Sequence, residues 1–119
     1  MNMLSSAADI KRAQSAASQR TLIRLALEKT QTMLDVARSG NWDDIEALEK
    51  ERRLVLEQCF EVAILPDNAE LFSEALAVML HMNEELVSLL EQAKAEAALR
   101  YSTHQKSQTA IKHYLDVES

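Results

Sequence analysis

The sequence has few of the residues that interrupt helices or build sheets. It contains one glycine, Gly40, and one proline, Pro66, and aromatic residues make up only 4% of it. No alternating run of valine, isoleucine, threonine and aromatic residues is bounded by turn residues, so the pattern typical of strands is missing. Alanine, leucine, glutamate, lysine and glutamine are abundant instead, and all are strong helix formers. The composition predicts an all-α fold.

Cysteine and long apolar runs are also scarce. The single cysteine, Cys59, cannot form an internal disulfide, which favours a reducing compartment. No apolar run approaches the roughly 20 residues of a membrane-spanning helix. The first residues lack the apolar core of a signal peptide. We therefore expect a soluble cytoplasmic protein with no membrane insertion.

The motifs of catalysis and of cofactor binding are absent. The sequence has no HExxH, CxxC, P-loop or glycine-rich nucleotide motif. Three histidines, His81, His104 and His113, are not paired with glutamate at the spacing typical of di-iron helical bundles. Cys59 falls on an apolar helix face, where a lone cysteine is usually a small hydrophobic residue. We expect no enzyme activity, no metal and no cofactor.

The net charge of −6 is unevenly distributed along the chain. Residues 1–40 carry +3, residues 41–99 carry −10 and residues 100–119 carry +1. An acidic middle region is unsuited to direct nucleic-acid binding, which depends on cationic side chains against phosphates. Two interpretations of the acidic region stay open: a solvated surface, or steering of a basic partner.

Turn residues divide the chain into helical segments. The apolar spacing predicts a firm helix over 21–38, which ends because Gly40 can adopt the positive φ of a helix stop. Asn41 is predicted to cap the second helix, and the short turn makes the two helices antiparallel neighbours. Pro66 separates the second helix from a long third helix over about 68–104.

The expected architecture is an antiparallel three-helix bundle, or a set of helical hairpins, with a long third helix and a short fourth one. Residues 1–19 have few large apolar side chains and are expected to be a weakly ordered or conditional helical extension. Residues 20–104 would form the bundle. A polar stretch, 102–109, suggests a hinge before a C-terminal amphipathic helix over 105–119.

The third helix carries two adjacent apolar stripes, interrupted at the polar Asn83. That face is too wide for a two-stranded coiled coil, and the helix is longer than any other helix here can cover. We therefore expect an apolar strip between helices two and three that a partner helix can occupy. Ordinary core packing is the competing interpretation for each residue. The candidate partner-binding residues are Ile45, Leu48, Arg52, Leu56, Phe60, Leu76, Met79, Leu86 and Leu90.

Two of the polar or amphipathic candidates allow alternatives. The stem of Arg52 can pack while its head reaches Glu49 or Glu51, or the guanidinium can face a partner. Trp42, directly after the turn, can cover the end of the bundle or contact a partner.

The apolar residues of the last helix, Ile111, Tyr114 and Leu115, recur at helical spacing. A helix that short is unstable alone, so it must dock on its own bundle or on another protein.

Two stretches resemble a known family. The turn Arg38-Ser39-Gly40-Asn41-Trp42-Asp43 is followed by a helix carrying Ile45, Leu48, Glu49, Glu51 and Arg52. This is similar to the Gly-x-Trp-Asp turn and acidic, leucine-spaced helix of the FliT family of flagellar export chaperones. The segment Ser102-Thr103-His104-Gln105-Lys106-Ser107 resembles the polar stretch before the last helix in enterobacterial members. The resemblance covers about residues 20–115.

The resemblance implies a function that composition does not reveal. Members of the family bind the C-terminal region of the filament-cap protein FliD, keep it unassembled in the cytosol and deliver it to the flagellar type III export apparatus. The implied export partners are the ATPase complex and the gate protein FlhA. Part of the family also binds the flagellar master regulator and inhibits flagellar transcription. The last helix is autoinhibitory, which here would place Ile111, Tyr114 and Leu115 over the binding surface.

A different class of function also fits the apolar strip. The chain would then be a helical oligomerisation or adaptor module, including a homodimer, with no chaperone role. A concentration-dependent mass in solution distinguishes this alternative from an export chaperone.

Overall fold

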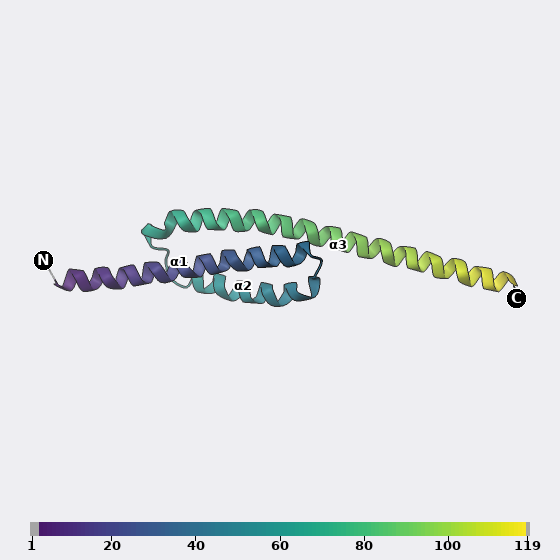
Figure 1. Cartoon of the computed structure of the whole chain (residues 1–119), viewed down its shortest axis with the longest axis horizontal. Coiled ribbons are helices and arrows are strands. Elements are labelled where there is room, and N and C mark those ends of the chain that lie inside the picture. The colour runs from purple at the N-terminus through teal and green to yellow at the C-terminus, as the bar shows by residue number, and fades with distance from the viewer. Residues whose placement is uncertain (1–2, 119) are drawn as a thin grey trace. The chain divides into compact units, whose positions relative to one another are not determined.

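The computed structural model describes residues 3–118, and side chains within 7–116. It consists of three α-helices: α1 (Met3–Arg38), α2 (Ile45–Cys59) and α3 (Ala69–Glu118). Two single-turn 3-10 helices, η1 (Trp42–Asp44) and η2 (Pro66–Asn68), lie in the connections (Figure 1). The described residues contain no strand, which confirms the predicted all-α class.

The separate fourth helix predicted over 105–119 is wrong, because α3 continues without a break from Ala69 to Glu118. The polar stretch that suggested a hinge contains no glycine or proline. Its side chains bond within the helix: the Thr109 hydroxyl donates to the Gln105 carbonyl oxygen at 2.9 Å, and Gln105 Nε2 donates to Tyr101 Oη at 3.0 Å. Polar composition alone therefore does not interrupt a helix here.

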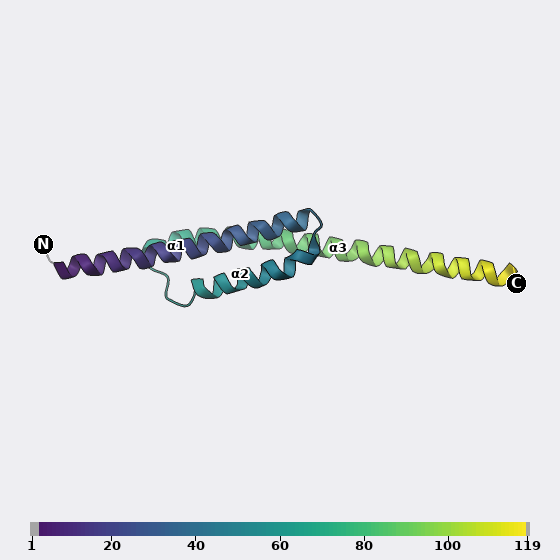
Figure 2. The ribbon, with the colours of Figure 1, turned by 60° about the horizontal axis from the view of Figure 1, so that its bottom comes forward.

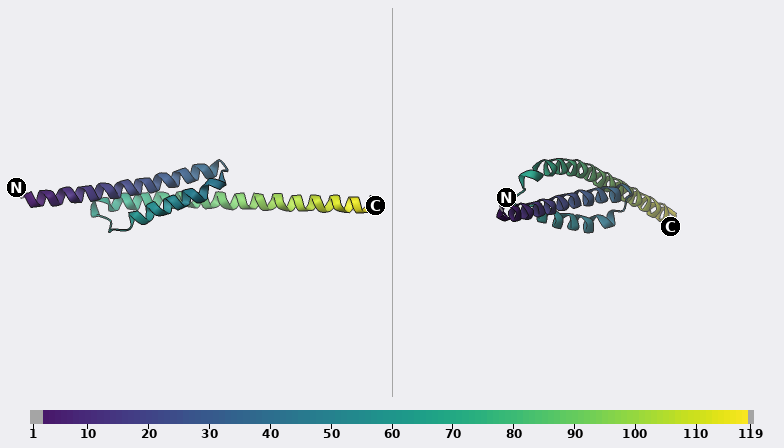
Figure 3. Two further views of the ribbon diagram at one scale, coloured as in Figure 1. Left: turned by 90° about the horizontal axis from the view of Figure 1, so that it is seen from below. Right: turned by 60° about the vertical axis from the view of Figure 1, so that its left-hand side comes forward.

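The chain divides into two compact units, residues 1–86 and 87–119. In the first unit, α1, α2 and the first part of α3 run alongside one another (Figures 2 and 3). Their buried side chains form one core, and at its edge the ring of the half-exposed Phe60 meets that of the buried Phe72 edge to face, at 6.3 Å between centroids. The core cluster contains Ile23, Ala26, Val55, Cys59, Phe72, Ala75 and Met79.

Cross-helix contacts give the directions of the helices in this unit. Lys29 Nζ of α1 pairs with Glu51 Oε2 of α2 at 3.2 Å, and further back along α1 Gln19 Nε2 donates to the Ala63 carbonyl oxygen at 2.8 Å. Helices α1 and α2 are therefore antiparallel. Near the other end of α1, Arg38 Nη2 donates to Glu85 Oε1 of α3 at 2.7 Å.

The turn between α1 and α2 depends on Gly40, whose φ of +80° is the only positive value among the described residues. The Asn41 N–H donates to the Val36 carbonyl oxygen, and the Gly40 N–H to that of Ala37. This pair of bonds is a Schellman motif, so the predicted helix stop is confirmed. The predicted cap is wrong: Asn41 makes no capping bond to the backbone, and its Nδ2 donates to Asp44 Oδ2 at 2.7 Å instead. Helix α2 begins at Ile45, after the turn η1.

A buried polar cluster fixes the connection between α2 and α3. Asn68 is fully buried, and its Nδ2 donates to the Ala16 carbonyl oxygen at 2.9 Å and to Gln19 Oε1 at 3.0 Å. Arg20 Nη1 donates to Asn68 Oδ1 at 3.2 Å, and the Leu65 N–H donates to Gln19 Oε1 at 3.1 Å. Ala16 and Gln19 are themselves buried, so the packed part of α1 begins before residue 20.

The second unit contains the remainder of α3. None of its described side chains is buried, and Leu89 and Ala93 are half-buried. The predicted tail residues Ile111, Tyr114 and Leu115 are exposed. None of the helices in the described part of the chain combines the length and apolarity that crossing a membrane requires.

Candidate partner-binding groove

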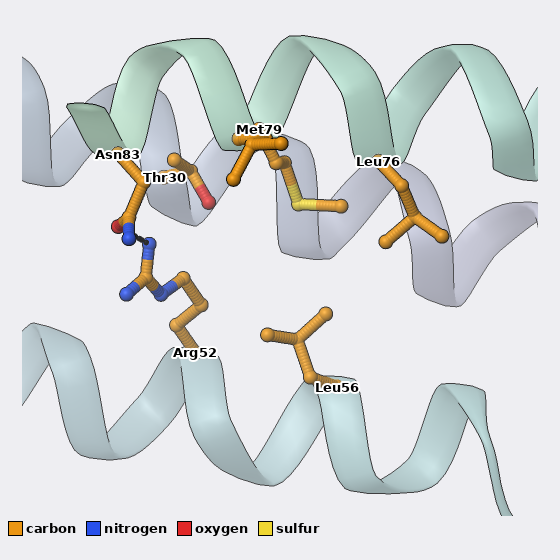
Figure 4. Close-up of a pocket in the computed structure, with 7 residues that line it drawn as sticks. Thr30, Arg52, Leu56, Leu76, Met79 and Asn83 are labelled. Atoms are coloured by element: carbon orange, nitrogen blue, oxygen red, sulfur yellow. Dashed lines mark hydrogen bonds between the residues drawn. The ribbon is translucent and has the colours of Figure 1, made fainter. Parts of the chain in front are cut away.

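A groove with a volume of about 240 Å³ lies between α2 and α3 in the first unit. In Figure 4, Leu56 extends from α2 toward Leu76 and Met79 of α3, while Thr30 comes from α1 behind them. The groove is lined by Thr30, Arg52, Leu56, Leu76, Met79, Leu80 and Asn83.

The floor and the rim of the groove differ in exposure. Thr30 and Met79 are buried, and the Thr30 hydroxyl donates to the Ala26 carbonyl oxygen at 2.9 Å, so it offers no unsatisfied donor to a ligand. Leu80 on the rim is 63% exposed, and Leu76 is partly exposed beside it. Apolar surface that stays open between two packed helices is suited to receive apolar side chains of another segment.

Arg52 supplies the groove's positive charge. Its Nη1 donates to Asn83 Oδ1 at 3.0 Å, and Figure 4 shows the guanidinium reaching from α2 to this amide on α3. Neither Glu49 nor Glu51 forms the predicted direct bond with Arg52: Glu49 accepts from Arg53 at 2.6 Å and Glu51 from Lys29 at 3.2 Å.

Burial of Arg52 lowers the pKa of its guanidinium, and the nearby charge of Glu49 partly opposes this shift. An arginine stays protonated in proteins, so the groove holds a permanent cation whose hydration is partly removed. Its only hydrogen-bond partner among the described residues is a neutral amide.

The structure brings four of the nine candidate residues together in the groove: Arg52, Leu56, Leu76 and Met79. The other five lie elsewhere. Ile45 and Leu48 are half-buried nearer the start of α2, and Leu86 is buried. Phe60 is half-exposed after the end of α2, with its ring against Phe72. Leu90 belongs to the second unit.

Sequence reasoning missed three residues that line the groove: Thr30, Leu80 and Asn83. Asn83 carried a signal, because it is the polar residue that interrupts the apolar stripe of the third helix. Leu80 lies one turn after Leu76 on the same helix. Thr30 gave no signal, since it reaches the groove from α1, on the far side of the core.

Two further residues that the sequence made interesting, Cys59 and Trp42, do not line the groove. Cys59 is buried in the core, and burial raises the pKa of its thiol, which favours the neutral form. Trp42 is half-buried in η1. Within the described residues, no group of three or more histidine, cysteine, aspartate or glutamate side chains gathers to hold a metal ion.

Comparison with known proteins adds one finding. Residues 20–116 match the family model described as flagellar protein FliT. The match includes α2, all the residues that line the groove, and α3 through Asp116. No curated protein and no solved structure matches the chain.

Proposed function

Since this chain belongs to the FliT family of flagellar proteins, we propose that it is an export chaperone that binds the C-terminal region of the filament-cap protein FliD in the groove between α2 and α3. The family indicates a role in flagellar export in general. The particular cargo and the groove as its binding site are our proposal.

One observation carries this proposal. The groove combines a buried apolar floor with an exposed apolar rim at Leu76 and Leu80. A helix that lays its apolar side chains into such a groove removes this surface from water, at about 25 cal/mol per Å² of apolar area buried. Recognition of a helix in a groove is a recurring way in which proteins bind peptide segments.

Holding the cargo in this way would serve export in the cytoplasm. With its C-terminal region occupied, the cap protein would stay unassembled until the chaperone reaches the type III export apparatus. The export ATPase complex and the gate protein FlhA are the receiving partners that we propose. Inhibition of the flagellar master regulator is a further role, which the acidic region over 41–99 supports if that partner is basic.

We also propose that the C-terminal part of α3 regulates the groove. Ile111, Tyr114 and Leu115 expose three large apolar side chains over one turn and a half of helix. Docking such a segment returns about 1.5–3 kcal/mol for each buried side chain, against roughly 1–2 kcal/mol for each residue ordered. Because α3 is continuous, it would also have to break for its end to turn back onto the groove, so docking of the tail would be weak and a cargo segment could displace it.

The groove is tested by a charge on its rim. Leu80→Glu should weaken binding of the FliD C-terminal region at least tenfold in calorimetry, because it places a carboxylate against apolar cargo. Leu54→Glu is the matched control: Leu54 is 61% exposed, close to the 63% of Leu80, and does not line the groove. If the two variants bound the FliD C-terminal region with equal affinity, the groove would not be the binding site.

The tail is tested by deleting residues 105–119. Autoinhibition predicts tighter binding of the FliD C-terminal region by the shortened chain, because its groove has no internal competitor. A chain in which Ile111, Tyr114 and Leu115 are replaced by serine should gain affinity in the same direction. Unchanged or weaker binding in both cases would exclude a competing tail.

A second function, oligomerisation, is favoured by the exposed apolar side chains of residues 87–116, among them Leu99 and Tyr101. Two copies could cover these surfaces mutually. Light scattering over a hundredfold range of concentration distinguishes the two functions. A mass that rises with concentration and does not change when the cap-protein segment is added would favour the oligomerisation module.

A further inference from the structure

We infer that Arg52 is an anion anchor inside the groove, and that the partner segment seated there is an amphipathic helix that carries a carboxylate to meet it. The inference rests on the proposed function and deepens it, because it specifies the chemistry of the bound segment. Apolar side chains of that helix would lie on Leu56, Leu76 and Leu80.

The first support is the unfilled hydrogen-bonding capacity of the guanidinium. Arginine has five N–H donors in a planar fork that fits a carboxylate through two parallel bonds. In this structure one nitrogen, Nη1, donates to Asn83 Oδ1. A neutral amide oxygen compensates a partly desolvated cation less well than a carboxylate does, since charge-assisted bonds are roughly twice as strong.

The second support is that the neighbouring acidic residues are already engaged. Glu49, one turn before Arg53, accepts from that residue at 2.6 Å. Glu51 accepts from Lys29, and Glu85 accepts from Arg38 through both of its carboxylate oxygens. Arg52 forms no ion pair with any carboxylate in the part of the chain that the structure describes.

The third support is charge complementarity. Every lining residue except Thr30 belongs to region 41–99, which has a net charge of −10, yet the lining contains one charged side chain, and that side chain is a cation. A purely apolar segment would bury the guanidinium with only the nearby charge of Glu49 to compensate it, and Glu49 is already paired with Arg53, so this burial is costly. A segment with a basic residue facing Arg52 would be repelled. A carboxylate facing inward, with basic or neutral residues facing the acidic surroundings, meets both conditions.

Adjacent arginines on α2 make the test sharp. Arg52→Met keeps an apolar stem about as long as that of arginine but removes the guanidinium and its charge, and Arg53→Met makes the same change on an exposed residue that does not line the groove. Binding of each full-length variant to a peptide spanning the FliD C-terminal region is measured by calorimetry. We expect Arg52→Met to weaken binding about 10- to 30-fold, and Arg53→Met by less than about threefold.

Two further measurements separate an ion pair from lost packing. Arg52→Lys should recover part of the affinity, because it restores the charge without the fork. Raising the salt concentration should weaken binding by the wild-type chain more than binding by Arg52→Met. Circular dichroism melting of each variant shows that the fold is retained.

The peptide supplies a test that leaves this chain unaltered. Each aspartate or glutamate of the peptide is replaced in turn by its amide. One replacement should weaken binding to the wild-type chain as much as Arg52→Met does, and should add little when combined with it.

The outcomes distinguish the two proposals. If the wild-type chain does not bind the peptide, the proposed function and the anchor are both overturned. If it binds, but Arg52→Met behaves like Arg53→Met and no acidic residue of the peptide matters, the anchor alone is overturned.

Discussion

The two units of the chain are helical for different reasons. In residues 1–86, buried side chains from three helices meet in one core, and hydrogen bonds join residues far apart in the sequence, such as Asn68 and Ala16. In residues 87–116 no described side chain is buried, and the side-chain hydrogen bonds link residues four apart, as between Thr109 and Gln105. One part is held by tertiary packing, while the hydrogen bonds of Gln105 and Thr109 in the other are local helical ones.

Because of this contrast, large apolar side chains are expected to contribute differently to stability in the two units. An apolar side chain such as Phe72, which is 1% exposed, contributes to stability, whereas Leu99, which is 68% exposed, does not. Helices without tertiary support are marginal in water, so the C-terminal part of α3 should respond readily to a partner. The groove lies in the unit with the packed core, and a site built on packed elements is held in shape before its ligand arrives.

Amide hydrogen exchange of the whole chain should show the largest difference. Amides of residues 87–118 are expected to open with a free energy of about 0–1 kcal/mol, and those around Ile23 and Phe72 with several kcal/mol, near the global value. The measurement is repeated over a dilution series. Protection of residues 87–118 that equals the core at every concentration would contradict the comparison, and protection lost on dilution would reveal a second copy as the cover.

Truncating a core side chain should have the next largest effect. Phe72→Ala is expected to lower the free energy of unfolding by about 3–5 kcal/mol, because it removes apolar contacts and leaves a cavity. Leu99→Ala is the counterpart in the second unit and should change that free energy by less than about 0.5 kcal/mol. Urea denaturation followed by circular dichroism gives both values. A large loss from Leu99→Ala would mean that the second unit is packed in solution.

A buried polar cluster should contribute an intermediate amount. Asn68→Ala removes a hydrogen-bond donor from the buried amide oxygen of Gln19 and from the Ala16 carbonyl oxygen. The substitution should lower the free energy of unfolding by about 1–3 kcal/mol. Asn41→Ala is a suitable control, because Asn41 is exposed and its hydrogen bond to Asp44 is local. If both substitutions lowered the unfolding free energy equally in urea titrations, the buried cluster would have no special role.

The sequence predicted the parts of the fold that depend on local features. Composition predicted the all-α class, and Gly40 and Pro66 predicted the breaks between the helices. The prediction of a fourth helix failed because polar composition was interpreted as a hinge, although nothing in 102–109 prevents the helix from continuing. The cap at Asn41 failed because a 3-10 turn intervenes before α2.

Long-range features could not be predicted from the sequence. The hydrogen bonds between Gln19 and Asn68 join residues far apart in the chain, and no local pattern indicates them. The apolar stripes identified Leu56, Leu76 and Met79 as candidates. Whether each was core or groove depends on how α1 fills the space between α2 and α3, and helical spacing carries no such information. The partner of Arg52 depended in the same way on which carboxylates other cations had already engaged.

The smallest expected effect concerns the ion pair next to the end of the first unit. Arg38 donates to both oxygens of Glu85, at 2.7 and 2.9 Å, one residue before that unit ends at Leu86. Both side chains are about half-exposed, so a double-mutant cycle with Arg38→Ala and Glu85→Ala should give a coupling of only about 0.2–1 kcal/mol, falling as salt increases. The same cycle on Arg53 and Glu49, a pair within one helix, is the reference. A bidentate pair that joins two helices closes a longer loop of chain than a pair within one helix. If the coupling between Arg38 and Glu85 exceeds that between Arg53 and Glu49, the end of the packed region is fixed by charge as well as by the core. If Arg38 and Glu85 show no coupling, the apolar contacts around Leu86 alone determine where the packing ends.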